Sequence, residues 1–413
     1  MNISSVRLLH VGIMDAPQVC VSCGGIMFRL RYVAEGRIGI DDAGVHEGEF
    51  VQDGPFTLHD VVIGKQFHWQ QKESQTFRGR LRVVAVGGML RAINDVDVET
   101  YLKSVISSEM AATNSLELLK THAVISRSWV LRQLLPKSQE KPLLLRLPVG
   151  LQQDEKVVAR IWDHDDHEYY DVCADDHCQR YQGITREVSE WVAEAVDATC
   201  GMVLLDADGE VCDTRFFKAC GGHTERFSAC WQDRDYGYLS PTADAYCRPE
   251  ALEKLPGGTS GVLRLILNAY DRPTLDYHEW TERYTVDELS DIVESRLHAG
   301  VGRIVRLEPL ERGASGRIVW LRIVGTGGSV VVGKELMVRK ALSRTHLKSS
   351  WFDVEVQNAA DGRQQTFVLH GHGWGHGVGL CQIGAAAMSR QGFTFDEILS
   401  FYFPGARVAK LPV

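Results

Sequence analysis

Long apolar runs are missing from this chain. No stretch of its 413 residues approaches the roughly 18 consecutive apolar residues that a membrane-spanning helix needs. Residues 1–15 also lack the basic start, apolar run and small-residue cleavage site of a signal peptide. The sequence therefore predicts no transmembrane segment. It leaves two readings of export: the protein stays inside the cell, or a signal peptide is absent because it was trimmed off.

An excess of positive charge is missing too. Lys and Arg number 45 against 54 Asp and Glu, which gives a formal net charge of −9, and no basic block occurs. Binding to nucleic acid depends on clustered positive charge facing phosphates. The composition therefore argues against nucleic acid as a partner.

Cysteine is sparse, with 10 scattered residues. This density is too low for a disulfide scaffold, and the count does not fix the redox compartment. Cys20 and Cys23 have the spacing of half a zinc site, but no second half lies nearby, so we expect two structural cysteines there. With 44% hydrophobic and 24% charged residues, the chain is an ordinary folded protein, long enough for two or three domains.

The spacing of apolar residues predicts both strands and helices. Short apolar runs broken by glycine predict a β-rich region over 1–90. Asp97 can cap a helix that ends near Glu109 and Met110, and a second helix is expected over about 115–135. The same signals predict, in order, a helix over 187–199, a hairpin of 202–205 with 211–217, a helix from a Thr285–Glu288 capping box to Gly300, and a β stretch of 304–310 with 318–324.

Glu109 is the first candidate for chemistry. At the end of a helix, the negative end of the macrodipole should raise the pKa of a carboxyl group and favour its protonated form. A general acid needs that form near neutral pH. An isolated glutamate at a helix end is more often a solvated surface residue, so this motif alone decides nothing.

His167, Cys173 and Cys178 place one imidazole and two thiols in one short segment, with His177 as the rival histidine. This ligand set suits Zn²⁺ and leaves a fourth position for water, substrate or another side chain. Two buried cysteines with surface histidines, or a local disulfide between Cys173 and Cys178, would fit the same spacing. The spacing leaves these readings open.

The segment 371–382 alternates five glycines with two histidines and a tryptophan. Glycine permits positive φ and close approach of a ligand to the backbone, and flat rings edged by polar groups suit a sugar. No Lys-Ser/Thr pair follows, so this is not a phosphate loop. A glycine-rich turn packed under a helix would show the same pattern. Segment 220–225 is a similar polar turn, for which a hairpin end is the plainer reading.

Six segments, taken in this order, resemble the stage II sporulation protein D (SpoIID) family, which includes the LytB amidase-enhancer relatives. They are NDVDVETYLKSVISSEM (94–110), LKTHAVISRSWVL (119–131), DVCADDHCQRYQG (171–183), FFKACGGHTE (216–225), LKSSWFDV (347–354) and the glycine-rich 371–405. The resemblance covers roughly residues 77–407. Ala111 stands where the family usually has proline and Cys381 where it usually has serine, and the first seventy residues match nothing recognisable.

The resemblance implies a peptidoglycan lytic transglycosylase. Such enzymes cleave the β-1,4 bond between N-acetylmuramic acid and N-acetylglucosamine, typically in glycan strands without stem peptides, and leave 1,6-anhydro ends. Glu109 matches the family's acid and would serve as the single general acid and base, so the two-carboxylate rule of ordinary glycosidases does not apply.

The resemblance also implies a zinc ion, because some members hold one with a histidine and two cysteines spaced like His167, Cys173 and Cys178. That ion would either line the cleft beside Glu109 or staple a loop that has no core of its own. The candidate contacts with the glycan are Gln179, Tyr181, His223, His370, His372, Trp374, His376 and Gln382. For each histidine, a structural hydrogen bond explains its presence equally well.

Three other functions remain open. A non-catalytic glycan binder that stimulates a cell-wall amidase would keep the glycine-rich segment without depending on Glu109. A zinc hydrolase would use metal-activated water to cut the peptide cross-link. An intracellular protein that merely retains the fold would account for the missing signal peptide.

We expect an α+β fold of the SpoIID type, a multi-lobed body with a helical catalytic centre among small mixed and antiparallel sheets. Its expected blocks are a β-rich 1–90, a catalytic core with the metal loop at 91–250, an accessory helix and β region at 251–345, and a signature completing the cleft at 346–413. Because peptidoglycan lies outside the cytoplasm, we expect an extracytoplasmic location. Oligomeric state, glycan length and a role in sporulation or in general wall turnover do not follow from the sequence.

Overall fold

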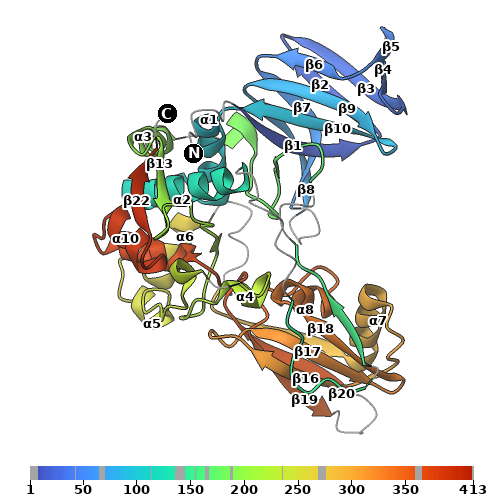
Figure 1. Ribbon diagram of the computed structural model, residues 1–413, viewed down its shortest axis with the longest axis vertical. Coiled ribbons are helices and arrows are strands. Elements are labelled where there is room, and N and C mark those ends of the chain that lie inside the picture. Colours follow the sequence, from blue (N-terminus) through green and yellow to red (C-terminus); the bar gives the residue numbers. More distant parts are fainter. Residues whose placement is uncertain are drawn as a thin grey trace. The chain divides into compact units, whose positions relative to one another are not determined.

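The protein consists of two units assembled from discontinuous segments (Figure 1). The computed structural model describes residues 8–41, 43–64, 70–112, 114–134, 145–153, 155–162, 167–186, 189–234, 236–267, 276–358 and 365–411. Unit 1 comprises residues 1–136, 164–213 and 407–413, and unit 2 comprises 137–163 and 214–406. The four consecutive blocks expected from the sequence stay a prediction.

Unit 1 begins with the expected β-rich part. Its strands are β1 (Leu9–Ala16), β2 (Gln18–Cys23), β3 (Ile26–Ala34), β4 (Arg37–Ile40), β5 (Gly44–Glu47), β6 (Phe50–Asp53), β7 (Phe56–Ile63), β8 (Gln71–Phe77), β9 (Arg80–Val86) and β10 (Met89–Val96). One sheet has the order β5-β4-β3-β2-β7-β8. The other has the order β12-β1-β10-β9-β6, so β12 (Val172–Cys173) brings the His/Cys segment into the sheet.

Cys20 and Cys23 both lie on β2 and are free thiols. Residues three apart on a strand point to opposite faces of the sheet. Accordingly, Cys23 is buried while Cys20 is only partly buried. The two cysteines therefore do not share a metal site on this strand, which agrees with the structural role expected for them.

The helices of unit 1 follow β10. They are α1 (Val98–Glu109), α2 (Leu116–Leu134), the 3-10 helix η3 (Gly183–Arg186) and α3 (Glu190–Ala198). Asp97 caps α1 as predicted, since its Oδ1 accepts a hydrogen bond from the backbone N–H of Thr100 at 2.9 Å. The predicted start of α3 at 187–188 lies outside the described residues. α1, α2 and α3 pack against one another, which fixes the end of α1 within a helical layer.

The hairpin predicted over 202–217 forms only next to its turn. β13 (Met202–Leu205) is joined to the following segment by the antiparallel Leu205–Val211 bridge and by a hydrogen bond from Cys212 N–H to Leu204 O at 2.9 Å. It also pairs antiparallel with the C-terminal strand β22 (Arg407–Lys410). β14 (Phe216–Phe217) pairs parallel with β21 (Leu380–Cys381). The turn before Gly209 forms as predicted, whereas the end of the expected second strand, β14, pairs outside the hairpin.

The described part of unit 2 contains three small sheets together with several helices. Its remaining strands are β11 (Lys156–Ala159), β15 (Glu279–Thr285), β16 (Ile304–Arg312), β17 (Ile318–Gly325), β18 (Gly328–Gly333), β19 (Phe352–Asn358) and β20 (Gln365–His372). The helices are α4 (Phe227–Cys230), the 3-10 helix η4 (Gly237–Leu239), α5 (Pro249–Leu252), α6 (Gly258–Ile266), α7 (Val286–Leu297), α8 (Glu335–Ala341), α9 (Gln382–Arg390) and α10 (Phe395–Tyr402). The sheets are β11-β18-β17-β16, β15-β20-β19 and β14-β21.

The core of unit 2 lies between α7, α8 and the two larger sheets. Trp280, Leu321, Phe352 and Phe367 are buried members of one apolar cluster there. The capping box predicted at Thr285 is present at the start of α7, and β16 and β17 pair antiparallel as a β stretch. Helices and small sheets together give the α+β fold that the sequence predicted.

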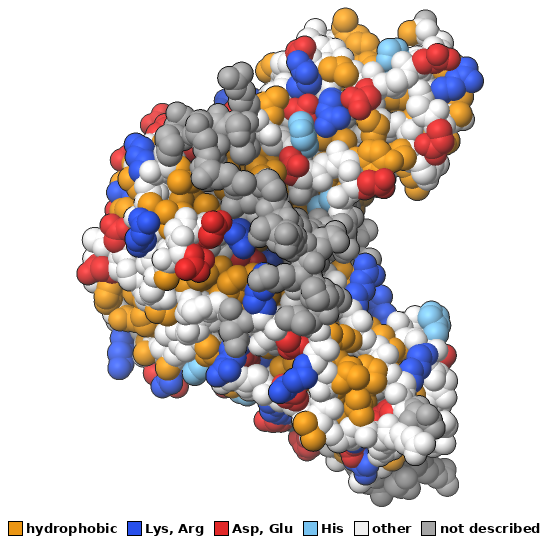
Figure 2. Space-filling model, in the orientation of Figure 1, with side chains coloured by type: hydrophobic (Ala, Val, Ile, Leu, Met, Phe, Trp, Pro, Cys, Tyr) orange, Lys and Arg blue, Asp and Glu red, His pale blue; other side chains and the backbone are white. Residues whose placement is uncertain are grey.

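The surface carries charges of both signs. On the described part of the face in Figure 2, acidic and basic side chains are interspersed over both units. Such mixing agrees with the argument against a phosphate-binding surface on this face. In the described residues, no helix is both long and apolar enough to cross a membrane.

Candidate active site and metal-binding loop

Glu109 is the last residue of α1 and is buried, with 8% of its surface exposed. Its Oε1 accepts a hydrogen bond from the backbone N–H of Arg180 at 3.0 Å. The reading of Glu109 as a solvated surface side chain is therefore wrong. A buried carboxyl group that is oriented by a fixed donor is suited to transferring a proton.

The segment after the His/Cys loop is bound to α1 at two further points. The backbone N–H of Gln182 donates to Ser104 Oγ at 3.1 Å, and Tyr101 Oη donates to Gln179 Oε1 at 3.1 Å. Together with the Arg180 bond, these contacts hold residues 179–182 along one side of the helix. The candidate acid and the loop are therefore positioned by the same helix.

Gln179 and Tyr181, which the sequence suggested as glycan contacts, are 1% and 2% exposed. Tyr181 Oη donates to Asn94 Oδ1 at 2.6 Å, and its ring stacks on Tyr101 with 5.0 Å between centroids. The structure gives both side chains a role in packing the loop against α1. Their contact with glycan stays a prediction.

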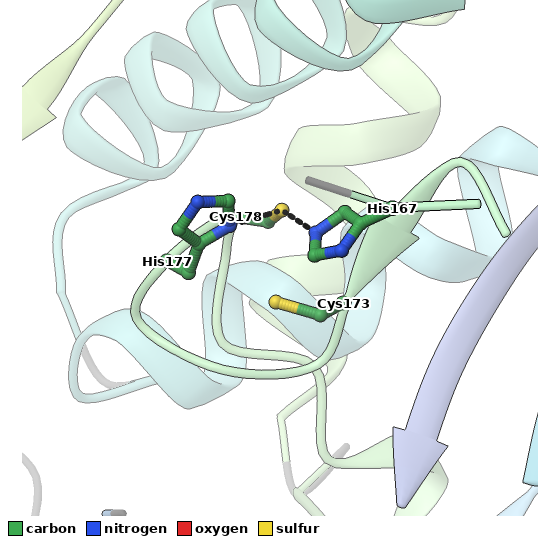
Figure 3. A group of neighbouring side chains, drawn as sticks. All are labelled: His167, Cys173, His177 and Cys178. Carbon is green, nitrogen blue, oxygen red and sulfur yellow. Dashed lines mark hydrogen bonds between the residues drawn. The ribbon is translucent and has the colours of Figure 1, made fainter. Parts of the chain in front are cut away.

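The predicted His/Cys set comes together in unit 1, with His177 as a fourth member (Figure 3). Cys178 Sγ lies 3.2 Å from His167 Nε2 and 3.4 Å from His177 Nδ1. The donor atoms of these three residues and Cys173 all lie within 4.8 Å of one another. Both cysteines are free, so the structure does not contain the local disulfide that the spacing allowed.

The donors in this loop suit a soft or borderline divalent metal ion. A hydrogen bond with Cys178 lowers the pKa of Cys173 to about 2, against the opposing effect of burial, so the thiolate is favoured at neutral pH. Two thiolates and two imidazoles match the four-ligand set of structural zinc sites, whereas three ligands would leave an open position. The loop can therefore hold a metal ion, and His177 decides which of these two types it forms.

Two residues that support His167 were not identified from the sequence. The Tyr170 ring lies against the His167 ring at 4.7 Å between centroids. Gly12, opposite Cys173 in the β1–β12 pair, leaves room for that tyrosine, because a Cβ at Gly12 would meet the Tyr170 ring at 2.4 Å. A glycine inside a predicted strand is the signal that could have indicated such a close approach.

Three of the predicted glycan contacts in unit 2 are at least partly exposed and already have neighbours. His370 Nε2 lies 3.0 Å from Glu355 Oε2. The His372 ring lies 4.9 Å from the Trp351 ring, and Trp374 stacks on Tyr277 at 4.9 Å. Their role in binding glycan stays a prediction.

The other three predicted contacts in unit 2 have local roles as well. His223 Nδ1 lies 2.9 Å from the carbonyl oxygen of Thr224. Burial holds the pKa of His376 well below its usual value, and its Nδ1 accepts a hydrogen bond from the backbone N–H of Val378 at 3.0 Å. Gln382 begins α9 and is 1% exposed. These positions also stay predictions as glycan contacts.

The glycine-rich segment uses its glycines in two ways. Gly373, Gly375, Gly377 and Gly379 have φ between 69° and 98°, a backbone conformation that other residues adopt at a cost. Gly371 instead lies within β20 against Trp280, where a Cβ would meet the indole ring at 2.0 Å. Four of the five glycines therefore shape the backbone as expected, and the fifth makes room for packing.

These features define a class of protein: an α+β protein in which a helix ends on a buried glutamate and holds a potential metal-binding loop. A family model described as "Stage II sporulation protein" matches residues 86–205, which contain Glu109 and the whole loop. Residues 86–205 therefore form a SpoIID-family region, which supports the resemblance of the chain to the SpoIID/LytB family. A second model, a domain of unknown function called DUF8618, matches residues 225–379.

Whole-chain relatives agree with this assignment. The stage II sporulation protein D of Bacillus subtilis is 22% identical over 325 residues, which cover 78% of this chain and 76% of that protein. An uncharacterized protein of Brachyspira hyodysenteriae is 25% identical over 384 residues, 91% of this chain and 81% of that protein. A Bacillus subtilis amidase enhancer is 32% identical over 68 residues, only 16% of this chain and 9% of that protein. The family relation indicates a function related to the cell wall.

Proposed function

We propose that this protein is a peptidoglycan lytic transglycosylase in which Glu109 is the single general acid and base. The observation that carries the proposal is the hydrogen bond from Arg180 N to Glu109 Oε1, because it orients a buried carboxyl group at the end of α1. The substrate is a glycan strand of alternating N-acetylglucosamine and N-acetylmuramic acid, without stem peptides. Because that polymer lies outside the cytoplasm, we propose an extracytoplasmic site of action.

The reaction needs one carboxyl group used twice. Protonated Glu109 donates its proton to the oxygen of the β-1,4 bond, so that the C1–O bond of the muramic acid breaks and the leaving sugar carries the hydroxyl group. The carboxylate of Glu109 then accepts the proton of the 6-hydroxyl, whose oxygen bonds to C1 and closes the 1,6-anhydro ring. No water is consumed, and Glu109 ends protonated, as it began.

We propose Zn²⁺ as the ion of the His/Cys loop, held by Cys173, Cys178 and His167, with His177 as the available fourth ligand. When bound, zinc would cross-link the loop or act as a Lewis acid in the cleft. The four donors favour the first role, since a complete ligand set leaves no position for substrate. The chain's own contribution is to keep residues 179–182 on α1 and thereby to orient Glu109.

The test compares Glu109→Gln with the wild type on purified glycan strands without stem peptides, with products read by mass spectrometry. Glutamine keeps the size of the side chain but removes the proton donor, so release of anhydro ends should fall by about 10² to 10⁴-fold. Glu117→Gln is the matched control, because Glu117 is a partly exposed carboxylate in the first turn of α2, paired with Lys120. Unchanged release by Glu109→Gln would remove this residue from the mechanism.

A second function is favoured by the match to an amidase enhancer. In that case the protein binds glycan and stimulates a cell-wall amidase without cleaving the strand itself. Wild type and Glu109→Gln would then increase amide cleavage by an added amidase equally, and neither would release anhydro ends.

The same product analysis tests metal-dependent peptide hydrolysis. Cleavage of the cross-link would produce new amines and would stop on chelation while the protein stays folded. Under our proposal, intact wall treated with the wild type gains anhydro ends and no new amines.

A further inference from the structure

Unit 2 contains a second group of metal-type ligands that the proposed function does not use. Cys220, Asp244, Cys247 and Cys381 are each 0% exposed, and one ligand atom from each lies within 4.8 Å of the other three. Two sulfur atoms bound at about 2.3 Å to one tetrahedral zinc ion lie about 3.8 Å apart. The four side chains are therefore close to the arrangement of a single tetrahedral site.

Backbone amides already point at two of these sulfur atoms. The N–H of Gly222 donates to Cys220 Sγ at 3.2 Å, while Cys220 N–H and Gly384 N–H donate to Cys381 Sγ at 3.3 and 3.4 Å. Such N–H to sulfur bonds stabilise negative charge on a thiolate, which is the form that binds metal. At Cys247, the Nε2 atom of His278 lies 3.7 Å from Sγ.

Asp244 is fixed as a ligating carboxylate would be. Its Oδ1 accepts hydrogen bonds from the backbone N–H groups of Tyr246 and Cys247, both at 3.0 Å. Its Oδ2 lies 3.3 Å from Cys220 Sγ and accepts the Tyr402 hydroxyl at 2.8 Å. Among the described residues, no lysine, arginine or histidine forms an ion pair with this buried carboxyl group. A divalent cation would supply that positive charge.

The surrounding chain has little regular structure of its own. Between residues 214 and 252, the described elements are β14, α4, η4 and α5, none longer than four residues. Cys381 reaches this region through β21, which pairs with β14. A metal ion bound by side chains from these segments would order a region that short elements alone hold weakly.

We propose that Cys220, Cys247 and Cys381, with Asp244 as the fourth ligand, form a second metal site that binds Zn²⁺ as a structural ion. The three thiols lose their protons to solvent as the metal binds. His278 and Tyr402 support the ligands through hydrogen bonds. This site is distinct from the His/Cys loop of unit 1 and does not depend on glycan cleavage.

The experiment measures metal content and thiol state in the full-length protein. The protein is purified under reducing conditions from zinc-supplemented cells and assayed by elemental mass spectrometry. Wild type should contain about two zinc ions per chain if the unit 1 loop is also filled. A Cys173→Ser/Cys178→Ser double variant isolates the second site and should retain about one.

Adding Cys247→Ser or Cys381→Ser to that double variant should remove the remaining zinc. Cys230→Ser is the matched control, because Cys230 is a buried free cysteine outside both groups, and it should retain the zinc. The wild type itself provides a readout that does not depend on the folding of variants. In the cobalt-substituted wild type, the thiolate-to-metal absorption should correspond to about five bound thiolates, because three are bound in unit 2 and two in the loop.

Two results would overturn the proposal. One is a reduced double variant that folds as the wild type does but binds no metal. The other is wild-type protein, purified without reductant, in which Cys220, Cys247 or Cys381 is in a disulfide. In that case, the same protein would also contain no zinc after the disulfide is reduced. A double variant without zinc would contradict only the second metal site. It would not bear on glycan cleavage by Glu109, so each proposal can fail without the other.

Discussion

At the scale of single residues, the candidate metal ligands are positioned by neighbouring residues that do not themselves bind metal. The Tyr170 ring fills the space between Gly12 and the imidazole of His167. Sequence reasoning identified His167, Cys173 and Cys178 by their types and spacing. It could not identify Gly12, because residues 12 and 170 become neighbours only when β1 pairs with β12.

Gly12→Ala should lower the metal content of the loop. The added methyl group would lie 2.4 Å from the Tyr170 ring, so the ring must move and displace His167, at a cost of about 1–3 kcal/mol. Elemental analysis and thermal unfolding measure the two effects. Gly237→Ala is the control, since nothing lies within 4 Å of its added Cβ. Full metal content in Gly12→Ala would show that this packing does not position the ligand.

At the scale of elements, α1 is the support on which the site is built. Its start, at Asp97, was predictable because capping is a local property of the sequence. The contacts of its side with residues 179–182 were not predictable, because they join positions more than seventy residues apart. The pairing of β13 with β22 was not predictable for the same reason, because β22 lies about two hundred residues further along the chain.

Ser104→Ala should lower the kcat because it loosens the loop, although the substitution does not alter Glu109 itself. The change leaves the buried N–H of Gln182 without its acceptor, which costs about 1–3 kcal/mol and loosens the segment that carries Arg180. Ser107→Ala is the matched control, because Ser107 Oγ bonds to Lys103 O within the same helix. We expect a lower kcat for Ser104→Ala than for Ser107→Ala at equal folded fraction. Equal kcat values for the two variants would show that the contact of the loop with Ser104 does not help to orient Glu109.

Asp97→Ala should destabilise unit 1 by about 0.5–2 kcal/mol, because the backbone N–H of Thr100 loses its capping acceptor. Urea unfolding measures the change, and Asp97→Asn, which keeps an acceptor oxygen, should restore most of the loss. A full loss in Asp97→Asn as well would mean that charge rather than capping is responsible.

At the scale of the whole molecule, a partly buried charge cluster joins β1 to β10. His10 Nδ1 lies 2.7 Å from Asp95 Oδ1, and Arg82 Nε donates to Asp95 Oδ2 at 2.9 Å. The hydrogen bond to Asp95 raises the pKa of His10. Burial would raise the pKa of Asp95, but hydrogen bonds from His10 and Arg82 lower it overall. The pair therefore stabilises the fold most where both groups are charged.

His10→Gln should destabilise the protein more at pH 5.5 than at pH 9. The raised pKa of His10 gives stability that is fully present below about pH 6.5 and is lost as pH rises through its folded value. The lowered pKa of Asp95 gives stability that is lost only as pH falls below about 3.8. Because His10 is 40% exposed, the difference should stay below about 1 kcal/mol. Thermal unfolding at the two pH values measures it, and equal losses would show that the pair does not couple to folding.

The fold class, the capped helices and the His/Cys loop followed from local patterns in the sequence. Pairings between distant segments did not, and they account for β13 with β22, for Gly12, and for the buried group around Cys381. The local sequence around each of these positions carries no special signal. Each position has its role because the fold brings it next to a residue that is distant in the sequence.

The central claim is that Glu109 cleaves glycan without using water. The most direct measurement incubates the wild type with glycan strands in water enriched in ¹⁸O and examines the new muramic acid ends by mass spectrometry. Our account predicts 1,6-anhydro ends without ¹⁸O in the wild type and none in Glu109→Gln. Reducing ends that carry one ¹⁸O atom, or anhydro ends formed equally by Glu109→Gln, would contradict it.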